Sequence, residues 1–370
     1  ELSILIASTW GAPTISKGYV TSSGIIGASG QPSANYSIRA ADCVIFLGCH
    51  FSITQSGSNY QPLNSRQIFI FVNIDANELS ILSSAHEALT IKANVNDFLE
   101  SFVDSIGDYD LHLNAHRRKL WDSHISTISN SLSPKSASQL LNVKGQLNPH
   151  YFICSLYNEL SDQDLVVVDG GGCALYAGFQ CIPSDASFTV ICSTSISAMG
   201  TGLPELCGAA MSKPLNSLSI CIIGDGSLMF NIQELQTIKT NLDSSGIIVL
   251  NNSGYLAIRH TQEQFLDKRF FGTSSTPNGI EIPSIQSIAN AFSYEYKALD
   301  CNENVDCLVD FIMSTKSLNK HLLIELIVSP MHENLFKASF IKSSNKDDFT
   351  QQDLHLMEPF STFNFKFPTV

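Results

Sequence analysis

Two polar turns, each directly after a predicted β-strand, constrain this chain more than any other feature. The tetrapeptide Gly-Asp-Gly-Ser contains Asp225, and a later Asn-Asn pair ends at Asn252. Apolar residues at helical spacing lie between the two turns, so the segment is predicted to be strand–helix–strand. The 27 positions from Asp225 to Asn252 are about what one parallel crossover needs. Both turns are therefore expected at the carboxyl edge of neighbouring parallel strands, where open α/β sheets bind ligands. The predicted strands cover residues 219–223 and 246–250, and the predicted helix covers 228–242.

The residue types in these turns suit a divalent cation bound to a phosphate. The Asp225 carboxylate, the Asn252 amide oxygen and the Gly254 carbonyl are hard oxygen donors, and phosphate oxygens and water would complete an octahedron. Gly226 lets the backbone approach a phosphate closely, and Ser227 offers a hydroxyl near a helix N-terminus. The alternative is an ordinary strand-to-helix turn with an Asp N-cap, followed by an Asn-rich turn. The whole combination favours the cation site.

At this point the chain resembles a known family. The stretches "GDGSLMFNIQELQTI" and "VLNNSGYLAIRHTQ" resemble the metal–diphosphate motif of thiamine-diphosphate enzymes, specifically the acetolactate-synthase-like group. "ANYSIRAADCVIFLGCHFS" and "IFIFVNIDANELS" are similar to that group's central domain, and "SAMGTGLPELCGAAM" is similar to the segment before its metal motif. The tail, "MHENLFKASF" and "DLHLMEPF", is similar to the C-terminus of members linked to surface-sugar synthesis. The resemblance covers nearly the whole chain.

The resemblance implies a site for thiamine diphosphate and Mg²⁺. It implies that Asp225 and Asn252 bind the metal through their side chains and Gly254 through its carbonyl, while Gly226 and Ser227 meet the diphosphate.

The family's first diphosphate loop corresponds to Gly171, Gly172 and Cys173. That loop commonly carries His, Gln or Asn, whereas this chain has Cys173 followed by Ala174. Backbone N–H groups are therefore expected to hold the phosphate here, and a tight turn that simply needs glycine is the alternative reading.

Met199 matches the bulky apolar residue that supports the bent cofactor in this family. The bend brings the aminopyrimidine next to the thiazolium carbon. Leu256 and Ile258 are expected to line the same cavity. Simple core packing is the alternative for Met199, since methionine commonly fills apolar gaps. Arg259, His260 and Gln262 are expected either to touch substrate or to form a solvated helix start.

The resemblance implies a carboligase that decarboxylates a pyruvate-like 2-keto acid and transfers the two-carbon unit to a keto acceptor, possibly a nucleotide-sugar. A simple 2-keto acid decarboxylase is one alternative. The other is a cofactor-binding module that is inactive alone, because the family's catalytic Glu belongs to an N-terminal domain with no counterpart in this sequence. We expect the 370-residue chain to be a C-terminal piece of a longer protein that forms a homo-dimer or tetramer.

Composition narrows the class of protein. Charged residues make up 15% and apolar residues 44%, which is typical of a folded soluble protein. The net charge of −13 argues against nucleic acid or a membrane surface as partners. The ten cysteines form no Cys-x-x-Cys pair, which fits a reducing compartment such as the cytoplasm.

The predicted fold class is α/β, with two doubly wound parallel-sheet domains. The predicted layout is a partial central domain at 1–105, a linker with one helix at 106–145, a thiamine-diphosphate and Mg-binding domain at 146–329 and a tail at 330–370. The glycine-rich residues 24–30 are expected to form a loop and no dinucleotide site, because no clear strand and helix flank them. FAD stays possible but unsupported, because the sequence "CHFSITQSGSNY", at the family's flavin loop, lacks arginine.

Overall fold

The computed structural model divides the chain into two compact units, which we call unit 1 and unit 2. Unit 1 comprises Glu1–Thr9, Tyr19–Leu132 and Phe336–Val370, and unit 2 comprises Trp10–Gly18 and Ser133–Leu335. The structure describes residues 4–14, 22–57, 60, 62–63, 65–85, 87–107, 115–136, 146–213, 217–274, 279–332, 334–335, 340–342 and 349–351. Within these residues no helix is long and apolar enough to cross a membrane.

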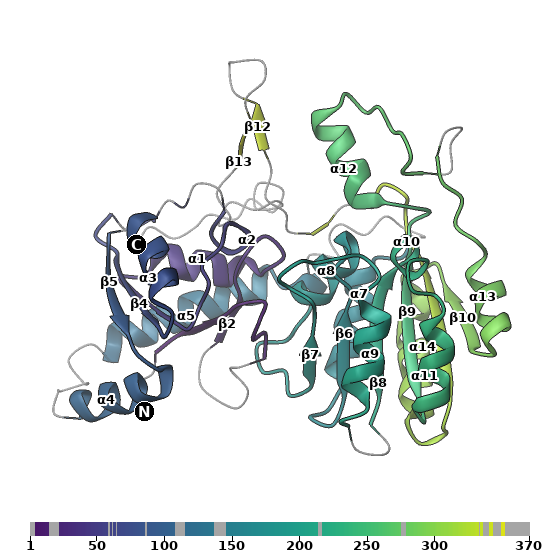
Figure 1. Ribbon diagram of the computed structural model, residues 1–370, viewed down its shortest axis with the longest axis horizontal. Helices are drawn as coiled ribbons and strands as arrows, with labels where there is room; N and C mark the ends of the chain where they lie inside the picture. Colours follow the sequence, from purple (N-terminus) through teal and green to yellow (C-terminus); the bar gives the residue numbers. More distant parts are fainter. Residues whose placement is uncertain are drawn as a thin grey trace. The chain divides into compact units, whose positions relative to one another are not determined.

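Unit 2 is built on a six-stranded sheet in the order β10-β11-β9-β8-β6-β7, and every neighbouring pair is parallel (Figure 1). Its central strands are almost wholly apolar and buried, which is typical of a parallel sheet covered by helices on both faces. The strands are β6 (Leu165–Val168), β7 (Thr189–Ile191), β8 (Ser219–Gly224), β9 (Ser245–Asn251), β10 (Glu295–Leu299) and β11 (His321–Ile327). The helices are α7 (Pro149–Asn158), α8 (Gly172–Gln180), α9 (Gly202–Ala210), α10 (Asp225–Leu228), α11 (Glu234–Asn241), α12 (Leu256–Phe265), α13 (Ile285–Phe292) and α14 (Val305–Ser314).

The predicted strand–helix–strand segment is present, with one correction. Strands β8 and β9 pair directly in parallel, so Asp225 and Asn252 follow adjacent strands at the same sheet edge. The single helix predicted over 228–242 is wrong, because α10 ends at Leu228 and α11 begins at Glu234. In the turn between them, the Asn231 side chain donates a hydrogen bond to the Gly200 carbonyl at 2.9 Å, a contact with a distant loop that helical spacing does not reveal.

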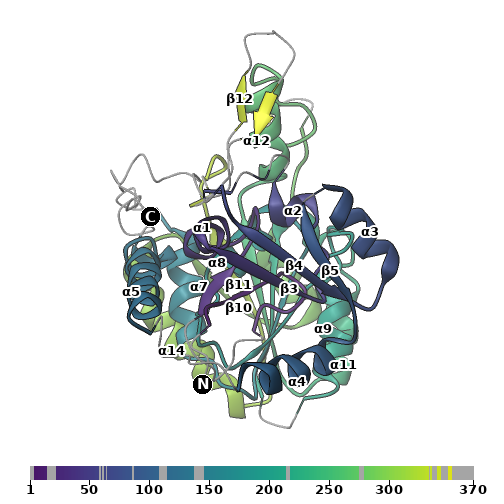
Figure 2. The same ribbon diagram turned by 90° about the vertical axis from the view of Figure 1, so that its left-hand side faces the viewer.

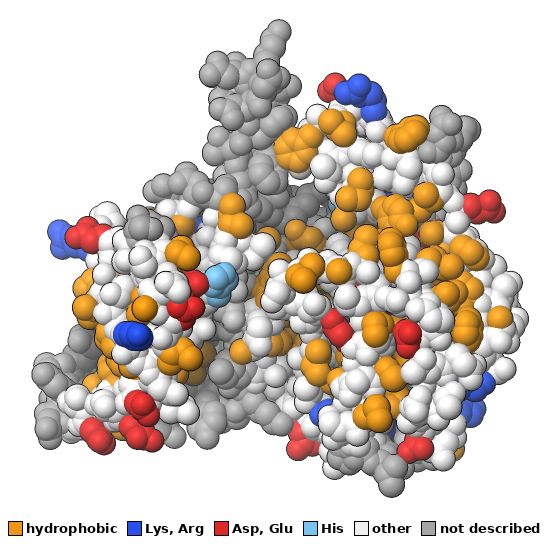
Figure 3. Space-filling view, in the orientation of Figure 1, with side chains coloured by type: hydrophobic (Ala, Val, Ile, Leu, Met, Phe, Trp, Pro, Cys, Tyr) orange, Lys and Arg blue, Asp and Glu red, His pale blue; other side chains and the backbone are white. Residues whose placement is uncertain are grey.

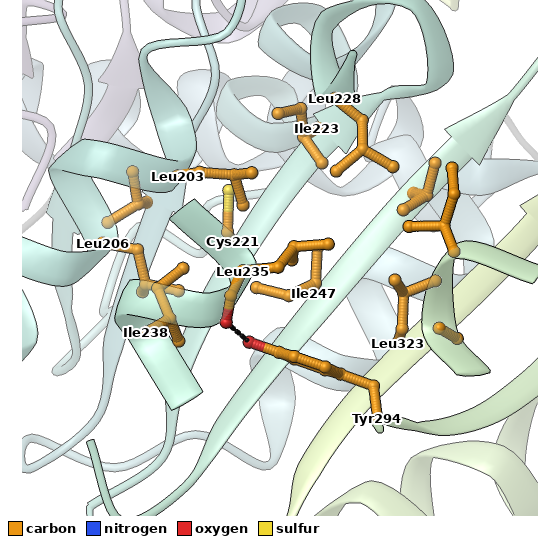
Figure 4. Packing of buried hydrophobic residues seen from close by; sticks show 14 of the residues in the cluster. Leu203, Leu206, Cys221, Ile223, Leu228, Leu235, Ile238, Ile247, Tyr294 and Leu323 are labelled. Carbon is orange, nitrogen blue, oxygen red and sulfur yellow. Dashed lines mark hydrogen bonds between the residues drawn. The ribbon is translucent and has the colours of Figure 1, made fainter. Parts of the chain in front are cut away.

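An apolar core fixes this segment against the sheet. Leu235 and Ile238 of α11 are fully buried, as their spacing predicts, and they pack with Leu206 of α9 and Ile247 of β9 (Figure 4). The Tyr294 hydroxyl donates to the Leu235 carbonyl at 2.8 Å, which satisfies the only polar atom of that ring inside the core (Figure 4).

Unit 1 contains a three-stranded parallel sheet in the order β3-β4-β5 and a two-stranded parallel pair, β1-β2. Figures 1 and 2 show helix α3 on one face of the three-stranded sheet and α1 and α5 on the other. The strands are β1 (Ile6–Ser8), β2 (Ser22–Ile25), β3 (Cys43–Leu47), β4 (Ile68–Asn73) and β5 (Ala88–Lys92), with a short antiparallel pair β12 (Phe340–Lys342) and β13 (Phe349–Gln351). The helices are α1 (Pro32–Ala40), α2 (Ile53–Ser56), α3 (Ala76–Ala85), α4 (Val95–Ile106) and α5 (Ala115–Ser131). The parallel sheets of both units confirm the predicted α/β class.

The glycine-rich loop of unit 1 differs from the sequence prediction, which expected no clear strand and helix beside it. Strand β2 ends at Ile25 and helix α1 begins at Pro32, so a strand and a helix do flank the loop. Three of its backbone N–H groups nevertheless donate to the protein: that of Ile26 to the Ser8 carbonyl, that of Gly27 to the Asn35 side chain, and that of Ala28 to the Thr54 carbonyl. A phosphate would need these donors, and they are already bonded to the protein.

Candidate functional site

The Asp225 carboxylate joins the two polar turns of unit 2. It is 1% exposed at the start of α10, and its Oδ1 accepts a hydrogen bond from its neighbour Gly226 at 2.9 Å. Its Oδ2 accepts from the Gly254 N–H at 2.8 Å, across to the turn after β9. Gly254 has φ +133°, and a Cβ there would lie 2.4 Å from the Thr273 carbonyl, so only glycine fits without displacement. The turns that the sequence places at one sheet edge are in direct contact.

The charge of Asp225 is incompletely compensated in the protein. Burial raises the pKa of its carboxyl to about 6, although the N–H groups of Gly254 and Gly226 and the charge of Arg259 each act in the opposite direction. A cation bound to such a carboxylate is strongly stabilising, because it offsets the cost of burying the ionised form.

We predict that this carboxyl makes the stability of the chain depend on pH. The pKa of this carboxyl is higher in the folded than in the unfolded protein. Its contribution to the free energy of unfolding is therefore fully present below about pH 4 and is lost as the pH rises through about 6. The loss is on the order of 3 kcal/mol. Urea unfolding of metal-free protein between about pH 4 and pH 7 measures this loss. Asp225→Asn should remove this part of the dependence of the unfolding free energy on pH. The same pH dependence in wild type and Asp225→Asn would contradict the prediction.

Asn252 is buried and held by Arg259 of helix α12. The Asn252 side-chain oxygen and main-chain carbonyl both accept from Arg259 Nη2, at 3.1 and 2.8 Å. Arg259 is 2% exposed and Gln262 is 8% exposed. Gln262 bonds to the Phe271 carbonyl and to the Thr273 hydroxyl. For these two residues a solvated helix start is wrong, because their polar atoms fold back on the protein.

Asp169, which is not among the site residues that the sequence predicts, holds the loop of Gly171, Gly172 and Cys173 in place. It is fully buried at the end of β6, and its carboxylate accepts from three backbone N–H groups: Gly171 at 3.0 Å, Gly200 at 2.9 Å and Gly202 at 3.0 Å. It therefore ties the predicted diphosphate loop to the loop that carries Met199. In the sequence, the pattern that could identify this residue is an Asp at the end of a predicted strand, directly before three glycines.

The predicted site residues of this loop lie close to the turn after β8 that carries Asp225. A Cβ on Gly171 would lie 2.6 Å from the Ser227 hydroxyl and 3.6 Å from Met199 Cγ, so these three residues are neighbours. A Cβ on Gly172 would lie 2.5 Å from the Ala257 side chain of α12. Burial raises the pKa of the Cys173 thiol to about 12, so Cys173 is a neutral thiol.

Leu256 and Ile258 do not share a face of α12. Leu256 is 2% exposed and Ile258 is 49% exposed. Residues two positions apart on a helix point to different sides. The structure therefore separates these two predicted cavity residues, and only Leu256 is part of the buried interior.

Two family models match the chain. The model described as "Thiamine pyrophosphate enzyme, central domain" matches residues 2–102, and the "Thiamine pyrophosphate enzyme, C-terminal TPP binding domain" matches residues 170–318. The second range holds every site residue that the sequence predicts, and Asp169 lies one position before it. The chain belongs to the thiamine pyrophosphate enzymes. Thiamine pyrophosphate is the same compound as thiamine diphosphate.

Acetolactate synthase large subunits are among the relatives of this thiamine pyrophosphate enzyme. The isozyme 2 large subunit of Escherichia coli is 27% identical over 79% of this chain and 49% of its own length. The isozyme 1 large subunit of Escherichia coli is 28% identical over 78% of this chain and 48% of its own length. The acetolactate synthase large subunit of Cyanidium caldarium is 24% identical over 83% of this chain and 49% of its own length. The chain spans about half the length of the curated relatives it matches.

The residues present fit a magnesium ion and the diphosphate of the cofactor. Asp225 and Asn252 provide a carboxylate and an amide oxygen, the hard donors that Mg²⁺ prefers. The N–H groups of Gly171 and Gly226 are bonded to carboxylates. These two N–H groups are therefore not free donors for a diphosphate. Close packing requires glycine at both positions, since a Cβ on Gly226 would lie 2.4 Å from the Tyr255 ring and one on Gly171 would lie 2.6 Å from the Ser227 hydroxyl. The first turn of α8, which includes Gly172 and Cys173, presents helix N-terminal N–H groups of the kind that bind phosphates.

Proposed function

We propose that this chain is the cofactor-binding part of a carboligase dependent on thiamine diphosphate and Mg²⁺. The enzyme would decarboxylate a pyruvate-like 2-keto acid and transfer the two-carbon unit to a keto acceptor. The observation that carries the proposal is the buried Asp225 carboxylate, bonded across to Gly254 at the ends of adjacent strands, within the match to the cofactor-binding domain. The names of the acetolactate synthase relatives support the carboligase class.

Each residue has a proposed task toward the cofactor. Asp225, Asn252 and the Gly254 carbonyl would hold Mg²⁺. When bound, thiamine diphosphate supplies the carbon nucleophile and the electron sink for decarboxylation.

The other site residues would hold and support the cofactor. Ser227 and the first turn of α8 would bind the diphosphate. Met199, next to Gly171, would be the apolar residue that supports the cofactor. Flavin is left out of the proposal, because nothing in the described residues supports it.

Calorimetry with thiamine diphosphate, with and without Mg²⁺, tests the cofactor assignment. We expect binding that requires Mg²⁺, and an absence of binding at high Mg²⁺ would contradict the proposal. Product analysis of the full-length protein, given pyruvate with and without a second keto compound, then tests the reaction. A ligated hydroxy-keto product supports the carboligase, whereas free aldehyde in both cases would identify a simple decarboxylase.

We also propose a cytoplasmic homo-dimer or tetramer for the full-length protein. Hydrophobic side chains gather on the visible face of unit 2 (Figure 3). The exposed apolar residues of this unit include Phe230, Ile258 and Phe271. Large apolar side chains exposed on one face are typical of a surface that binds another protein. Light scattering on the purified full-length protein would measure its mass, and a strict monomer would contradict this proposal.

A further inference from the structure

Arg259 uses its whole guanidinium group inside the protein, at the turn that carries Asn252. The side chain is 2% exposed, and the structure shows five hydrogen bonds from it. A guanidinium group has five N–H donors and no acceptor, so these bonds account for the donors of the group. All five acceptors are oxygens.

The five bonds join helix α12 to three other segments of unit 2. Nε donates to the Pro330 carbonyl at 2.9 Å, beyond the end of β11. Nη1 donates to the Ser253 carbonyl at 3.3 Å and the Thr273 carbonyl at 2.5 Å. Nη2 donates to Asn252 twice, to its main-chain carbonyl at 2.8 Å and to its side-chain Oδ1 at 3.1 Å. One rigid group thus fixes the asparagine turn against two distant segments.

The double contact with Asn252 has a specific consequence. Because one Nη2 atom holds both the main-chain and the side-chain oxygen, it restricts the rotation of the Asn252 side chain. Because a guanidinium only donates, the atom that faces it must be the amide oxygen and not the amide nitrogen. A carbonyl-type oxygen accepts two bonds, so Oδ1 keeps a second lone pair for a cation.

We propose that Arg259 is a positioning residue that presents Asn252 Oδ1 to the magnesium ion. The inference rests on the proposed function, and it adds to it a residue that does not itself touch metal or cofactor. Removing a group that hydrogen-bonds to a metal ligand and orients it commonly weakens metal affinity by about 10–100-fold. Lysine is no substitute here, since a single ammonium nitrogen cannot reach Asn252, Thr273 and Pro330 together.

The test is a Mg²⁺ titration by calorimetry at a fixed concentration of thiamine diphosphate. Arg259→Lys keeps the positive charge, so any effect reports geometry and not repulsion of the cation. The matched control is Lys316→Met, which removes the ion-pair partner of the buried Asp164 carboxylate, 2.6 Å away, at the opposite edge of the same sheet. We expect Mg²⁺ affinity about 10-fold weaker in Arg259→Lys and unchanged in Lys316→Met, even where both variants melt at lower temperature.

The double variant with Asn252→Ala separates positioning from general weakening of the fold. If Arg259 acts through Asn252, the Arg259→Lys change has little further effect on Mg²⁺ affinity once Asn252 is alanine. Additive effects, or an Arg259→Lys affinity within twofold of the control, overturn the inference. Arg259→Gln replaces Arg259→Lys if the lysine variant does not fold. Wild-type protein that binds no cofactor with Mg²⁺ overturns the proposed function and this inference together, whereas normal wild-type binding with unaffected variants overturns the inference alone.

Discussion

Replacing Asp225 with alanine is expected to abolish Mg²⁺-dependent binding of thiamine diphosphate. The change removes the proposed carboxylate ligand, and it also removes the acceptor of the Gly226 and Gly254 N–H groups. Two effects therefore coincide: the cation loses its only anionic protein ligand in the proposed set, and the bond between the two turns is broken. We expect cofactor affinity to fall on the order of 100-fold or more, the upper end of effects at metal sites. Calorimetry at saturating Mg²⁺ measures the change.

Two further variants make that result specific. Asp225→Asn keeps the shape of the side chain and removes the charge, and we expect it to lose most of the same affinity. Asp243→Asn makes the same charge change at an exposed position before β9, at the opposite sheet edge, and should bind as wild type. An Asp225→Ala variant that binds cofactor normally would remove Asp225 from the ligand set.

Replacing Asp169 with alanine is expected to cause a large loss of stability. Its carboxylate is the shared acceptor of the Gly171, Gly200 and Gly202 N–H groups, all at the buried end of β6. Hydrogen bonds to a charged group contribute about 1.5–3 kcal/mol each, and their loss leaves buried donors without partners. Since three bonds to one group are not additive, we expect the free energy of unfolding to fall by about 4 kcal/mol. Urea denaturation measures this fall.

The loss should be specific to the buried carboxylate. Asp185→Ala, at an exposed position of the same unit, should change the free energy of unfolding by less than about 0.5 kcal/mol. An Asp169→Ala variant with the same urea midpoint as wild type would show that the glycine loops hold their conformation without this acceptor.

The sequence predicts the parts of this protein that depend on local pattern. Apolar runs and helical spacing identify β8, β9 and the buried face formed by Leu235 and Ile238. The motif around Asp225 and Asn252 identifies the sheet edge where the two turns meet, because adjacent parallel strands end together.

What the sequence does not predict depends on contacts between distant residues. The break between α10 and α11 involves Asn231 bonding to Gly200, 31 positions away. The burial of Arg259 depends on Thr273 and Pro330, and Asp169 acquires its role from Gly200 and Gly202. None of these partners is marked by spacing or composition, so a polar residue on a short helix or at a strand end resembles a surface residue until the fold is known.

Binding of the cofactor at the Asp225 turn would give the loaded and empty forms of the protein different lifetimes. A ligand that binds only the folded state adds stability in proportion to the logarithm of its concentration over Kd, about 2.7 kcal/mol at a hundredfold excess. With Mg²⁺ at Asp225, as proposed, the gain would include relief of the unfavourable burial of that carboxylate. Cellular proteases that attack opened chains would therefore remove molecules without cofactor first, so vitamin supply would set the abundance of the protein as well as its occupancy.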